Sequence, residues 1–254
     1  GSEMCIRDST KWDKETDVLV IGYGGAGACA AIEAHDNGSK VLIIEKMVQP
    51  GGNTAISSGG FMVPQDGPTA LKYLTATYDL ANSEKDDELL NTFCKEIMGV
   101  KDWMTGLKEG TELWVYGHAG FQNLPGWEVI DKYRVRGKKR SGDCLFDLYR
   151  YAVEEKRNIP VMLETPAVQL IQKDGQVVGA VAKNNGKNIN IKANKAVILT
   201  TGGYEFDPES LRTYAQGENY HALGNPGNTG DGLRMAQSMG ARLWHMTAYS
   251  CPLG

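Results

Sequence analysis

The chain has 254 residues, 41% of them hydrophobic, and its net charge at pH 7 is −4. No run of about 18 apolar residues occurs, which argues against a membrane-spanning helix. The slightly acidic balance offers no electrostatic footprint for nucleic acid, and the basic cluster at 134–140 is local and typical of a solvated loop. Five cysteines without a C-x-x-C pair indicate reduced thiols in a cytoplasm rather than a disulfide framework or a zinc site.

Residues 1–16 are polar and mixed in charge, and they lack the apolar stretch of a secretory signal. We expect them to form a disordered or vector-derived tail. The folded domain is expected to span residues 17–254.

The first predicted elements form a β-α-β unit. Residues 17–21 are a short apolar run of the kind found in buried parallel strands. Residues 25–37 are rich in alanine and predict a helix closed by Gly38, and residues 40–44 predict a second strand. Because the connections are short, the two strands must run parallel.

The remaining elements follow in chain order. Residues 47–68 predict a glycine-rich loop system without periodicity, and helices are predicted at 69–81, at 86–107 with Ser83 as its cap, and at 142–157. Residues 111–137 predict turns and short strands. A meander is predicted from strands at 161–164, 167–173, 176–183, 188–192 and 196–200, with hairpin turns at Asp174-Gly175 and Asn185-Gly186. Short helices at 208–216 and 230–239 precede a strand that begins near Arg242.

The segment Gly22-Tyr23-Gly24-Gly25-Ala26-Gly27 matches the G-x-G-x-x-G fingerprint of dinucleotide-binding proteins, and it lies between a predicted strand and a predicted helix. Gly22 permits a tight turn, Gly24 lets a pyrophosphate approach the backbone, and Gly27 lets helix and sheet pack closely. Gly25 and Ala26 open the helix, whose unpaired N–H groups favour a bound anion.

Glu45 stands at the end of the second predicted strand, where a carboxylate accepts hydrogen bonds from ribose hydroxyls and repels a 2′-phosphate. NADP is therefore disfavoured. A surface glutamate paired with Lys46 is the alternative interpretation. These features predict a dinucleotide without deciding which one.

Three later segments also bring small residues together. The loop at 51–60 offers backbone N–H groups to a pyrophosphate and little bulk to a flat ring. Residues 200–203 follow a buried strand, at the position where ligands of open α/β sheets lie. In the turn at 228–232, Asp231 can cap the next helix.

With these segments the sequence resembles the flavoproteins of the fumarate reductase and 3-ketosteroid dehydrogenase superfamily from about Asp17 to Met246. The motifs that carry the resemblance are Gly51-Gly52-Asn53-Thr54-Ala55 with Ser57-Ser58-Gly59-Gly60, Thr200-Thr201-Gly202-Gly203-Tyr204, and Asn228-Thr229-Gly230-Asp231-Gly232 with Gly240-Ala241. The resemblance implies an α/β fold, a glutathione-reductase-like, Rossmann-type FAD-binding domain with a parallel sheet plus an antiparallel β meander. Beyond the fingerprint, it implies FAD contacts at Glu45, Lys46, Gly52, Asn53, Thr54, Ser58, Gly59, Gly60, Val168, Thr201, Gly202, Gly203, Thr229, Gly230 and Asp231.

The resemblance also bears on how FAD is held. Family members that attach FAD covalently use a histidine near the loop at 51–60, whereas the histidines here are His35, His118, His221 and His245. Non-covalent FAD is therefore expected. The family's substrate domain and closing FAD segment follow the part matched here, so we expect the FAD-binding domain to be incomplete.

The reaction implied by the resemblance is hydride transfer between flavin N5 and an activated CH–CH bond. The small-molecule substrate would be an enone, a ketosteroid or an α,β-unsaturated acid, and the electron partner is unknown. Fumarate reductases carry His-Pro-Thr where this chain has Trp244-His245-Met246-Thr247, which disfavours dicarboxylate reduction. Ketosteroid dehydrogenases place a tyrosine in the stretch corresponding to Tyr116, which makes it the catalytic candidate, with a packed aromatic as the alternative. His118 and His245 could titrate near neutral pH.

Other functions stay open. An NAD-dependent dehydrogenase would share the fingerprint, but it would continue β-α-β where this chain predicts a glycine-rich loop and a meander. A non-catalytic dinucleotide-binding module and a fumarate reductase-type enzyme are the remaining alternatives. The expected setting is a bacterial cytoplasm, with no nucleic acid or membrane as partner.

Overall fold

The computed structural model describes residues 11–118, 120–215, 222–244 and 246. The chain divides into two compact units: unit 1 combines Gly1–Ile56 with Tyr149–Gly254, and unit 2 is Ser57–Leu148. The sequence predicts one continuous domain, so this division is a finding of the structure.

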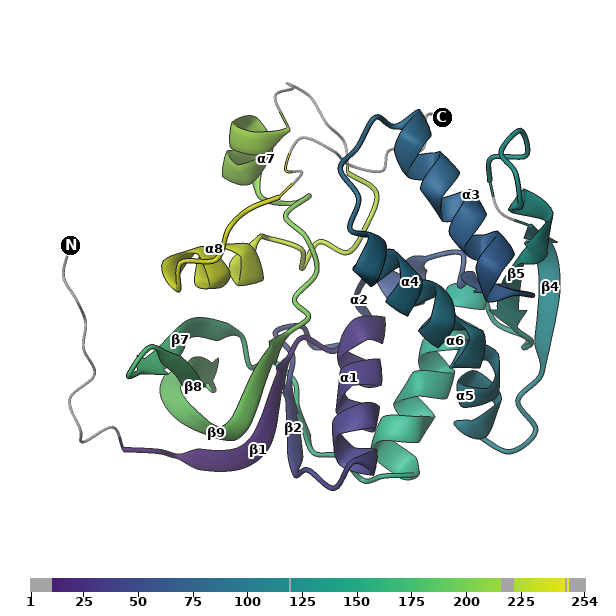
Figure 1. The fold of residues 1–254 in the computed structure, drawn as a ribbon. Helices are drawn as coiled ribbons and strands as arrows, with labels where there is room; N and C mark the ends of the chain where they lie inside the picture. Colours follow the sequence, from purple (N-terminus) through teal and green to yellow (C-terminus); the bar gives the residue numbers. More distant parts are fainter. Residues whose placement is uncertain (1–10, 119, 216–221, 245, 247–254) are drawn as a thin grey trace. The chain divides into compact units, whose positions relative to one another are not determined.

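A six-stranded sheet forms the centre of unit 1, in the order β6-β2-β1-β9-β8-β7 (Figure 1). β1 pairs in parallel with β2 and β9, β2 pairs in parallel with β6, and β7, β8 and β9 pair antiparallel. The predicted combination of a parallel sheet and an antiparallel meander is confirmed. The strands are β1 (Lys14–Ile21), β2 (Val41–Ile44), β6 (Val161–Met162), β7 (Ala167–Lys173), β8 (Gln176–Asn184) and β9 (Lys187–Leu199).

Helices flank this sheet, with α1 packed against β1 and β2 and α8 packed against β7. α1 begins directly after β1 and ends where Gly38 takes a φ of +78° just beyond the helix, as the sequence predicts. The helices of unit 1 are α1 (Gly25–Asp36), α2 (Gly52–Ile56), the π-helical turn η3 (Tyr151–Glu155), α7 (Pro208–Tyr214) and α8 (Asp231–Ser238).

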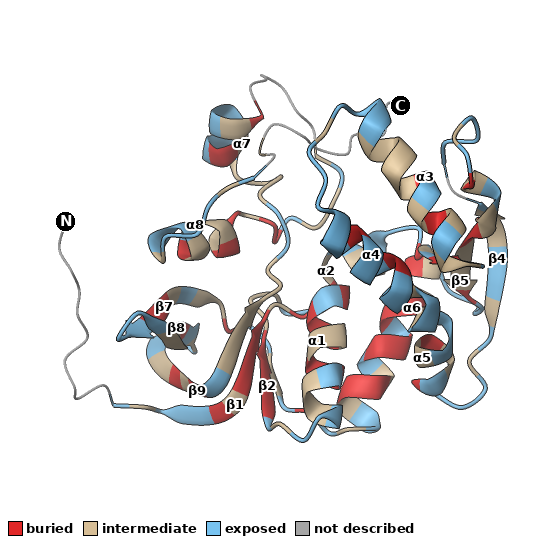
Figure 2. Ribbon diagram, viewed as in Figure 1, coloured by how far each residue is buried: buried red, intermediate tan, exposed pale blue. Residues whose placement is uncertain are grey.

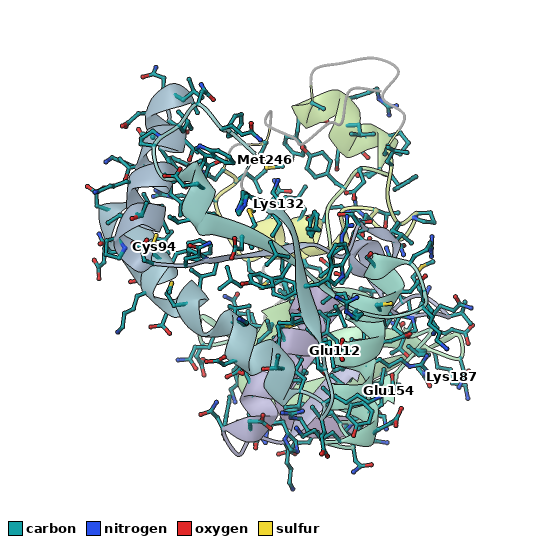
Figure 3. The ribbon with its side chains drawn as sticks, turned by 90° about the vertical axis from the view of Figure 1, so that its right-hand side faces the viewer. Cys94, Glu112, Lys132, Glu154, Lys187 and Met246 are labelled. Carbon is teal, nitrogen blue, oxygen red and sulfur yellow. The ribbon has the colours of Figure 1, made fainter. Side chains whose placement is uncertain are left out.

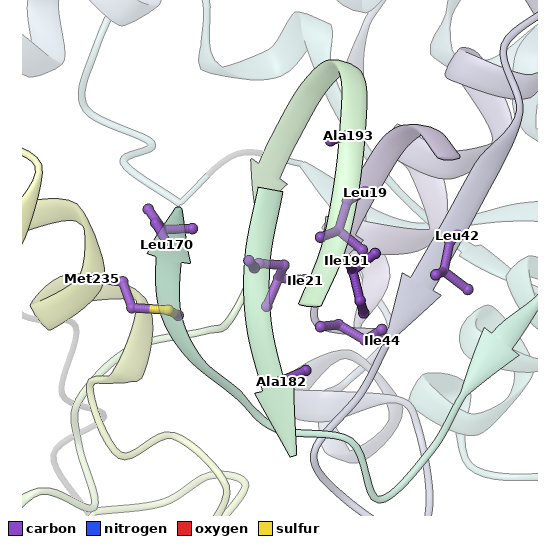
Figure 4. Packing of buried hydrophobic residues seen from close by; sticks show 10 residues of the cluster. Leu19, Ile21, Leu42, Ile44, Leu170, Ala182, Ile191, Ala193 and Met235 are labelled. Carbon is purple, nitrogen blue, oxygen red and sulfur yellow. The ribbon is translucent and has the colours of Figure 1, made fainter. Parts of the chain in front are cut away.

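The core of unit 1 lies between the parallel strands and the meander (Figure 4). Because side chains alternate along a strand, Leu19 and Ile21 of β1 share one face, and they belong to one buried cluster with Leu170 and Ile191 of the meander. Val18 and Val20 alternate to the other face, and both faces of β1 are buried over its second half (Figure 2). Each fully buried Leu or Ile contributes roughly 1.5–3 kcal/mol to stability. This two-sided burial fixes the strand ends on which the site is built.

Unit 2 contains a three-stranded antiparallel sheet in the order β3-β5-β4. Its helices pack through a small core in which Tyr73 of α3 and Cys94 of α4 meet Ile130 of β5; Cys94 is marked in Figure 3. The elements are β3 (Phe61–Pro64), α3 (Gly67–Leu80), α4 (Asp87–Glu96), η1 (Ile97–Gly99), α5 (Val100–Gly106), β4 (Leu113–His118), η2 (Trp127–Val129), β5 (Ile130–Val135) and α6 (Ser141–Arg150), whose last two residues belong to unit 1.

Several strand predictions were wrong. β1 begins at Lys14, so residues 14–16 belong to the sheet rather than to a disordered tail, and the hydroxyl of buried Thr16 donates to the Lys40 carbonyl oxygen at 2.9 Å. The strands predicted at 188–192 and 196–200 are the single strand β9, which pairs first with β8 and then with β1. The strand predicted at 161–164 pairs in parallel with β2 rather than in the meander. The strand predicted from Arg242 is absent over 241–244.

Helix boundaries also needed correction. Residues 47–68 are not loop throughout, because they contain α2 and β3, which are too short to show a period. Asp86, not Ser83, caps α4, since its Oδ1 accepts a hydrogen bond from Leu89 N at 2.9 Å. The helix predicted at 86–107 is divided into α4, η1 and α5.

Candidate cofactor site

A cavity of about 270 Å³ lies within unit 1 at the carboxyl ends of β1, β2 and β9. Ligands of open α/β sheets bind beyond these strand ends. Segments far apart in the sequence meet there. The lining residues are Ile21, Gly22, Gly24, Gly25, Ala26, Ile44, Glu45, Lys46, Met47, Gly52, Asn53, Thr54, Thr165, Ala167, Leu199, Thr200, Thr201, Gly202, Asn225, Gly227, Asn228, Asp231 and Met235.

Two fingerprint glycines serve the fold itself. Gly22 has a φ of +106°, and a Cβ there would collide with the carbonyl group of Thr200, the residue that follows β9. A Cβ on Gly27 would collide with the Gly22 carbonyl oxygen and lie 2.8 Å from Thr200 Oγ1. Both positions let α1 and the strands approach closely, as the fingerprint predicts.

Gly24 differs because the protein does not fill the space beside it. A Cβ there would meet no heavy atom closer than Gly51 O at 3.7 Å, although Gly24 lines the cavity. Its φ of −93° and ψ of −164° are open to any residue. Glycine at this position therefore leaves room for a ligand to lie against the backbone, as the fingerprint predicts for a diphosphate.

The N-terminus of α1 also lines the cavity. Gly24 is its N-cap and has no side chain with which to cap the helix. Gly25 N donates to Thr54 Oγ1 at 3.0 Å, which ties α1 to α2. The N–H groups at a helix N-terminus favour an anion.

Glu45 is fixed at the wall of this cavity. Its Oε2 accepts a hydrogen bond from Tyr23 N at 2.7 Å, and its Oε1 accepts one from Met47 N at 2.8 Å. An ionised carboxylate can accept about four hydrogen bonds, so two acceptor positions stay open to ribose hydroxyls. The predicted ribose contact therefore fits this geometry.

Lys46 is held by the turn before α8. Its Nζ donates to Asp231 Oδ2 at 2.7 Å and to Thr229 Oγ1 at 2.8 Å. Arg234 donates to Asp231 Oδ1 at 2.9 Å and to Asp207 Oδ2 at 2.9 Å. A hydrogen bond from Ser210 and the charge of Arg234 lower the pKa of Asp207, which caps α7. The network joins the end of β2 to α7 and α8.

Glu205 is a residue that sequence reasoning missed. Its Oε1 accepts from Asn53 Nδ2 at 2.9 Å and from Asn228 Nδ2 at 2.6 Å, and Asn53 Oδ1 accepts from Asn225 N at 2.6 Å. These bonds hold α2, the segment after β9 and the turn before α8 together. Glu205 directly follows the recognised motif at 200–204, and that position was the sequence signal that could have led to it.

Most of the predicted cofactor residues of unit 1 line the cavity, and the others do not. Gly27 packs α1, Gly203 O accepts from Gly230 N at 3.0 Å, and Thr229 contacts Lys46. Val168 is 47% exposed and lies at a register shift in β7. The predicted residues on the lining are Gly22, Gly24, Gly25, Ala26, Glu45, Lys46, Gly52, Asn53, Thr54, Thr201, Gly202 and Asp231.

Ser58, Gly59 and Gly60 belong to unit 2, as does Tyr116. A Cβ on Gly59 would collide with the Ser141 carbonyl, and one on Gly60 with the Tyr116 hydroxyl, so both glycines serve packing inside unit 2. The cofactor contacts of Ser58, Gly59 and Gly60 stay predictions.

Tyr116 is packed rather than isolated. The Arg134 guanidinium lies 3.9 Å from its ring centroid, and Trp114 lies edge-on at 6.0 Å. Its catalytic role stays a prediction. His118 Nδ1 lies 3.1 Å from Asp131 Oδ1 in the same unit. His245 and His221 fall outside the described residues.

Residues 17–251 match the family model described as FAD binding domain. This chain belongs to that family. Within the described ranges, no helix has both the length and the apolar character required to span a membrane.

The relatives are larger proteins. The chain is 31% identical over 241 residues to "Fumarate reductase (cytochrome)" of Shewanella frigidimarina, covering 91% of this chain and 41% of the relative. It is 32% identical over 246 residues to "Urocanate reductase" of Eggerthella lenta, covering 91% and 39%. Among solved structures, 3-ketosteroid-delta4-(5alpha)-dehydrogenase from Rhodococcus jostii RHA1 has the same fold, with a TM-score of 0.80 and 24% identity over 96% of this chain and 58% of the other.

Proposed function

We propose that this chain is the FAD-binding part of an oxidoreductase that moves hydride between flavin and an activated CH–CH bond. The observation that carries this proposal is that residues of the fingerprint and of the segments at 51–60, 200–203 and 228–232 line one cavity at the ends of β1, β2 and β9. Substrate classes are suggested by the relatives, whose names refer to fumarate, urocanate and a ketosteroid.

Bound FAD supplies a ring nitrogen that gives or accepts hydride. The chain's own residues bind and orient it. Gly24 leaves room for the diphosphate, Glu45 offers acceptors to a ribose, and the N-terminus of α1 favours the negative charge. Tyr116 is our candidate for moving a proton to or from the substrate. The loop at 51–60 contains no histidine, which supports non-covalent FAD.

Within the substrate classes, we propose an enone, a ketosteroid or an unsaturated monoacid. The absence of His-Pro-Thr after Gly240-Ala241 supports this choice. A dicarboxylate reductase is the second candidate, and the identity to a fumarate reductase favours it. We place the reaction in a cytoplasm, which the free thiols of Cys29, Cys94 and Cys144 support.

Titration of the purified chain with FAD tests the binding part of this proposal. Quenching of flavin fluorescence, together with a red shift in the visible flavin band, is the expected result. Acid precipitation should release all the flavin into the supernatant, because no covalent bond is proposed. Absence of any FAD binding contradicts the proposed function.

Turnover requires the protein that carries this chain with the further length that its relatives have. A reduced dye would supply electrons to a steroid enone, an acrylate-type acid and fumarate in parallel assays. Faster reduction of the first two supports our choice of substrate, whereas a preference for fumarate supports the second candidate.

A further inference from the structure

The cavity lining has an unusual distribution of charge for a site that would hold a diphosphate. Among the described residues that line it, Lys46 is the only cationic side chain, and Glu45 and Asp231 are carboxylates. The formal charge of the lining is therefore −1. Removal of Lys46 would make it −2 beside a ligand that itself carries about two negative charges, and like charges repel strongly where water is scarce.

The Lys46 ammonium is already engaged. It is 2.7 Å from Asp231 Oδ2 and 2.8 Å from Thr229 Oγ1, and the Lys46 and Asp231 side chains are only 24% and 30% exposed. An ammonium group has three donors, and two of them are used here. A direct bond to a phosphate would therefore need the third donor or a break from Asp231.

Asp231 is fixed from both sides. Arg234 donates to its Oδ1 at 2.9 Å and to the Thr229 carbonyl oxygen at 2.6 Å, but Arg234 does not line the cavity. Asp231 also opens α8, where the helix N-terminus favours a carboxylate. Of the two cations on Asp231, Lys46 alone stands on the cavity side.

We propose that Lys46 is a positioning residue whose task is to neutralise Asp231, so that a carboxylate can stand beside the diphosphate of FAD without repelling it. It is the counterion of Asp231 and not a ligand of the phosphates. The same pair ties the end of β2 to the turn before α8. This inference rests on the proposed binding of FAD.

A double-substitution cycle tests this role. FAD dissociation constants are measured by fluorescence quenching for the wild type, Lys46→Met, Asp231→Asn and the double variant. Lys46→Met should weaken binding about tenfold, a moderate loss for a partly buried pair. In the Asp231→Asn background the same change should cost less than about threefold, because the lining then falls from a formal charge of 0 only to −1, the charge at which the wild type binds FAD.

Controls separate charge from folding. Lys46→Gln keeps donors for Asp231 and Thr229 but lacks the charge, and it should bind FAD as weakly as Lys46→Met. Lys187→Met removes an exposed lysine of unit 1 at the start of β9, outside the cavity lining (Figure 3), and should bind like the wild type. Melting temperatures of the FAD-free variants show which of them are folded. If Lys46→Met is not folded, Lys46→Gln takes its place in the cycle.

The outcomes are distinct. Equal losses from Lys46→Met in both backgrounds would overturn the proposal and assign Lys46 to the phosphates or to folding alone. If Lys46→Met binds FAD as tightly as the wild type does, the proposal is also overturned. A wild type that takes up no FAD overturns the proposed function as well, whereas binding without coupling overturns only the role of Lys46.

Discussion

Gly24 and Gly27 stand three residues apart in the same turn, yet the space around them differs. A Cβ on Gly27 would meet backbone and Thr200, whereas a Cβ on Gly24 would meet no atom closer than 3.7 Å. Gly27→Ala should therefore destabilise the FAD-free protein by about 1–3 kcal/mol through overpacking. Gly24→Ala should leave that melting temperature unchanged and weaken FAD binding at least tenfold, because the methyl group would occupy the diphosphate's place.

Thermal melts and FAD titrations of the two variants check this contrast. A large loss of stability in Gly24→Ala would show that the glycine serves the fold, and unchanged FAD binding would remove the main argument for a diphosphate at this turn.

A second residue-scale prediction concerns Asp36 at the end of α1. Arg157 donates two hydrogen bonds to its carboxylate, at 2.7 and 2.6 Å, and holds the pKa of Asp36 at about 2. A lowered carboxyl pKa contributes stability above the unfolded value near 3.8, and this is lost as the pH falls towards 2. The Asp36 side chain is 43% exposed, so solvent screening limits the contribution to below about 1 kcal/mol.

Asp36→Asn should lower the melting temperature slightly at pH 7, and the difference from the wild type should vanish near pH 2. Melting curves from pH 7 to pH 2 measure it. A difference that stays constant over this range would mean that the ion pair does not contribute.

Single residues were predictable where one local constraint decides them. The roles of Gly22 and Gly27 follow from a turn between a strand and a helix, and Asp174 and Asn185 have φ of +49° as their hairpin turns require. The Lys46–Asp231 pair was out of reach, because 185 positions separate its members and neither residue type demands the other.

The meander turns allow a prediction at the scale of elements. Gly186 has a φ of +75°, and a Cβ there would meet nothing within 4 Å. Gly186→Ala should therefore lower the free energy of unfolding only by the strain of a left-handed alanine, about 1–2 kcal/mol. Gly106 also has open space, but it lies in α5 without a positive φ. Gly106→Ala should therefore stabilise the protein by at most roughly 0.5–1 kcal/mol, the gain of a helix interior, because Gly106 is the last residue of α5.

Chemical denaturation of both variants gives the two free energies of unfolding. Opposite signs are expected from the same substitution at two uncrowded positions. A neutral Gly186→Ala would mean that the turn relaxes into another type.

Long apolar or strongly signalled elements were predictable, and short or composite ones were not. α1, β2 and the apolar half of β1 follow from pattern alone, whereas the first three residues of β1 do not. β9 was divided in two by its polar stretch at Lys192–Lys195, because the sequence cannot show that this strand leaves β8 and continues beside β1. α2 and β3 contain five and four residues, too few for a period to appear.

At the scale of the whole molecule, the division into two units left no mark in the sequence. No linker or shift in composition separates Ser57 from Ile56 or Leu148 from Tyr149, and unit 1 is assembled from two distant parts of the chain. Its cofactor cavity draws on both parts, since Gly24 and Glu45 come from the first and Thr201 and Asp231 from the second. About 90 residues of unit 2 separate these two parts in the sequence, so bringing them together has an entropic cost. FAD, which would contact both parts, should therefore stabilise unit 1.

Ligand-induced stabilisation tests the cavity as a dinucleotide site. At a free FAD concentration of about 100 times the dissociation constant, one site adds about 2.7 kcal/mol, which for a chain of this size raises the melting temperature by roughly 5–10 °C. ADP carries the ribose and diphosphate that Glu45 and Gly24 fit, so it should also raise the melting temperature, though less. FMN lacks the adenosine half and should have little effect. If FMN equals FAD and ADP does nothing, then Glu45 and Gly24 do not recognise the half of the cofactor assigned to them, and the cavity serves the flavin end instead.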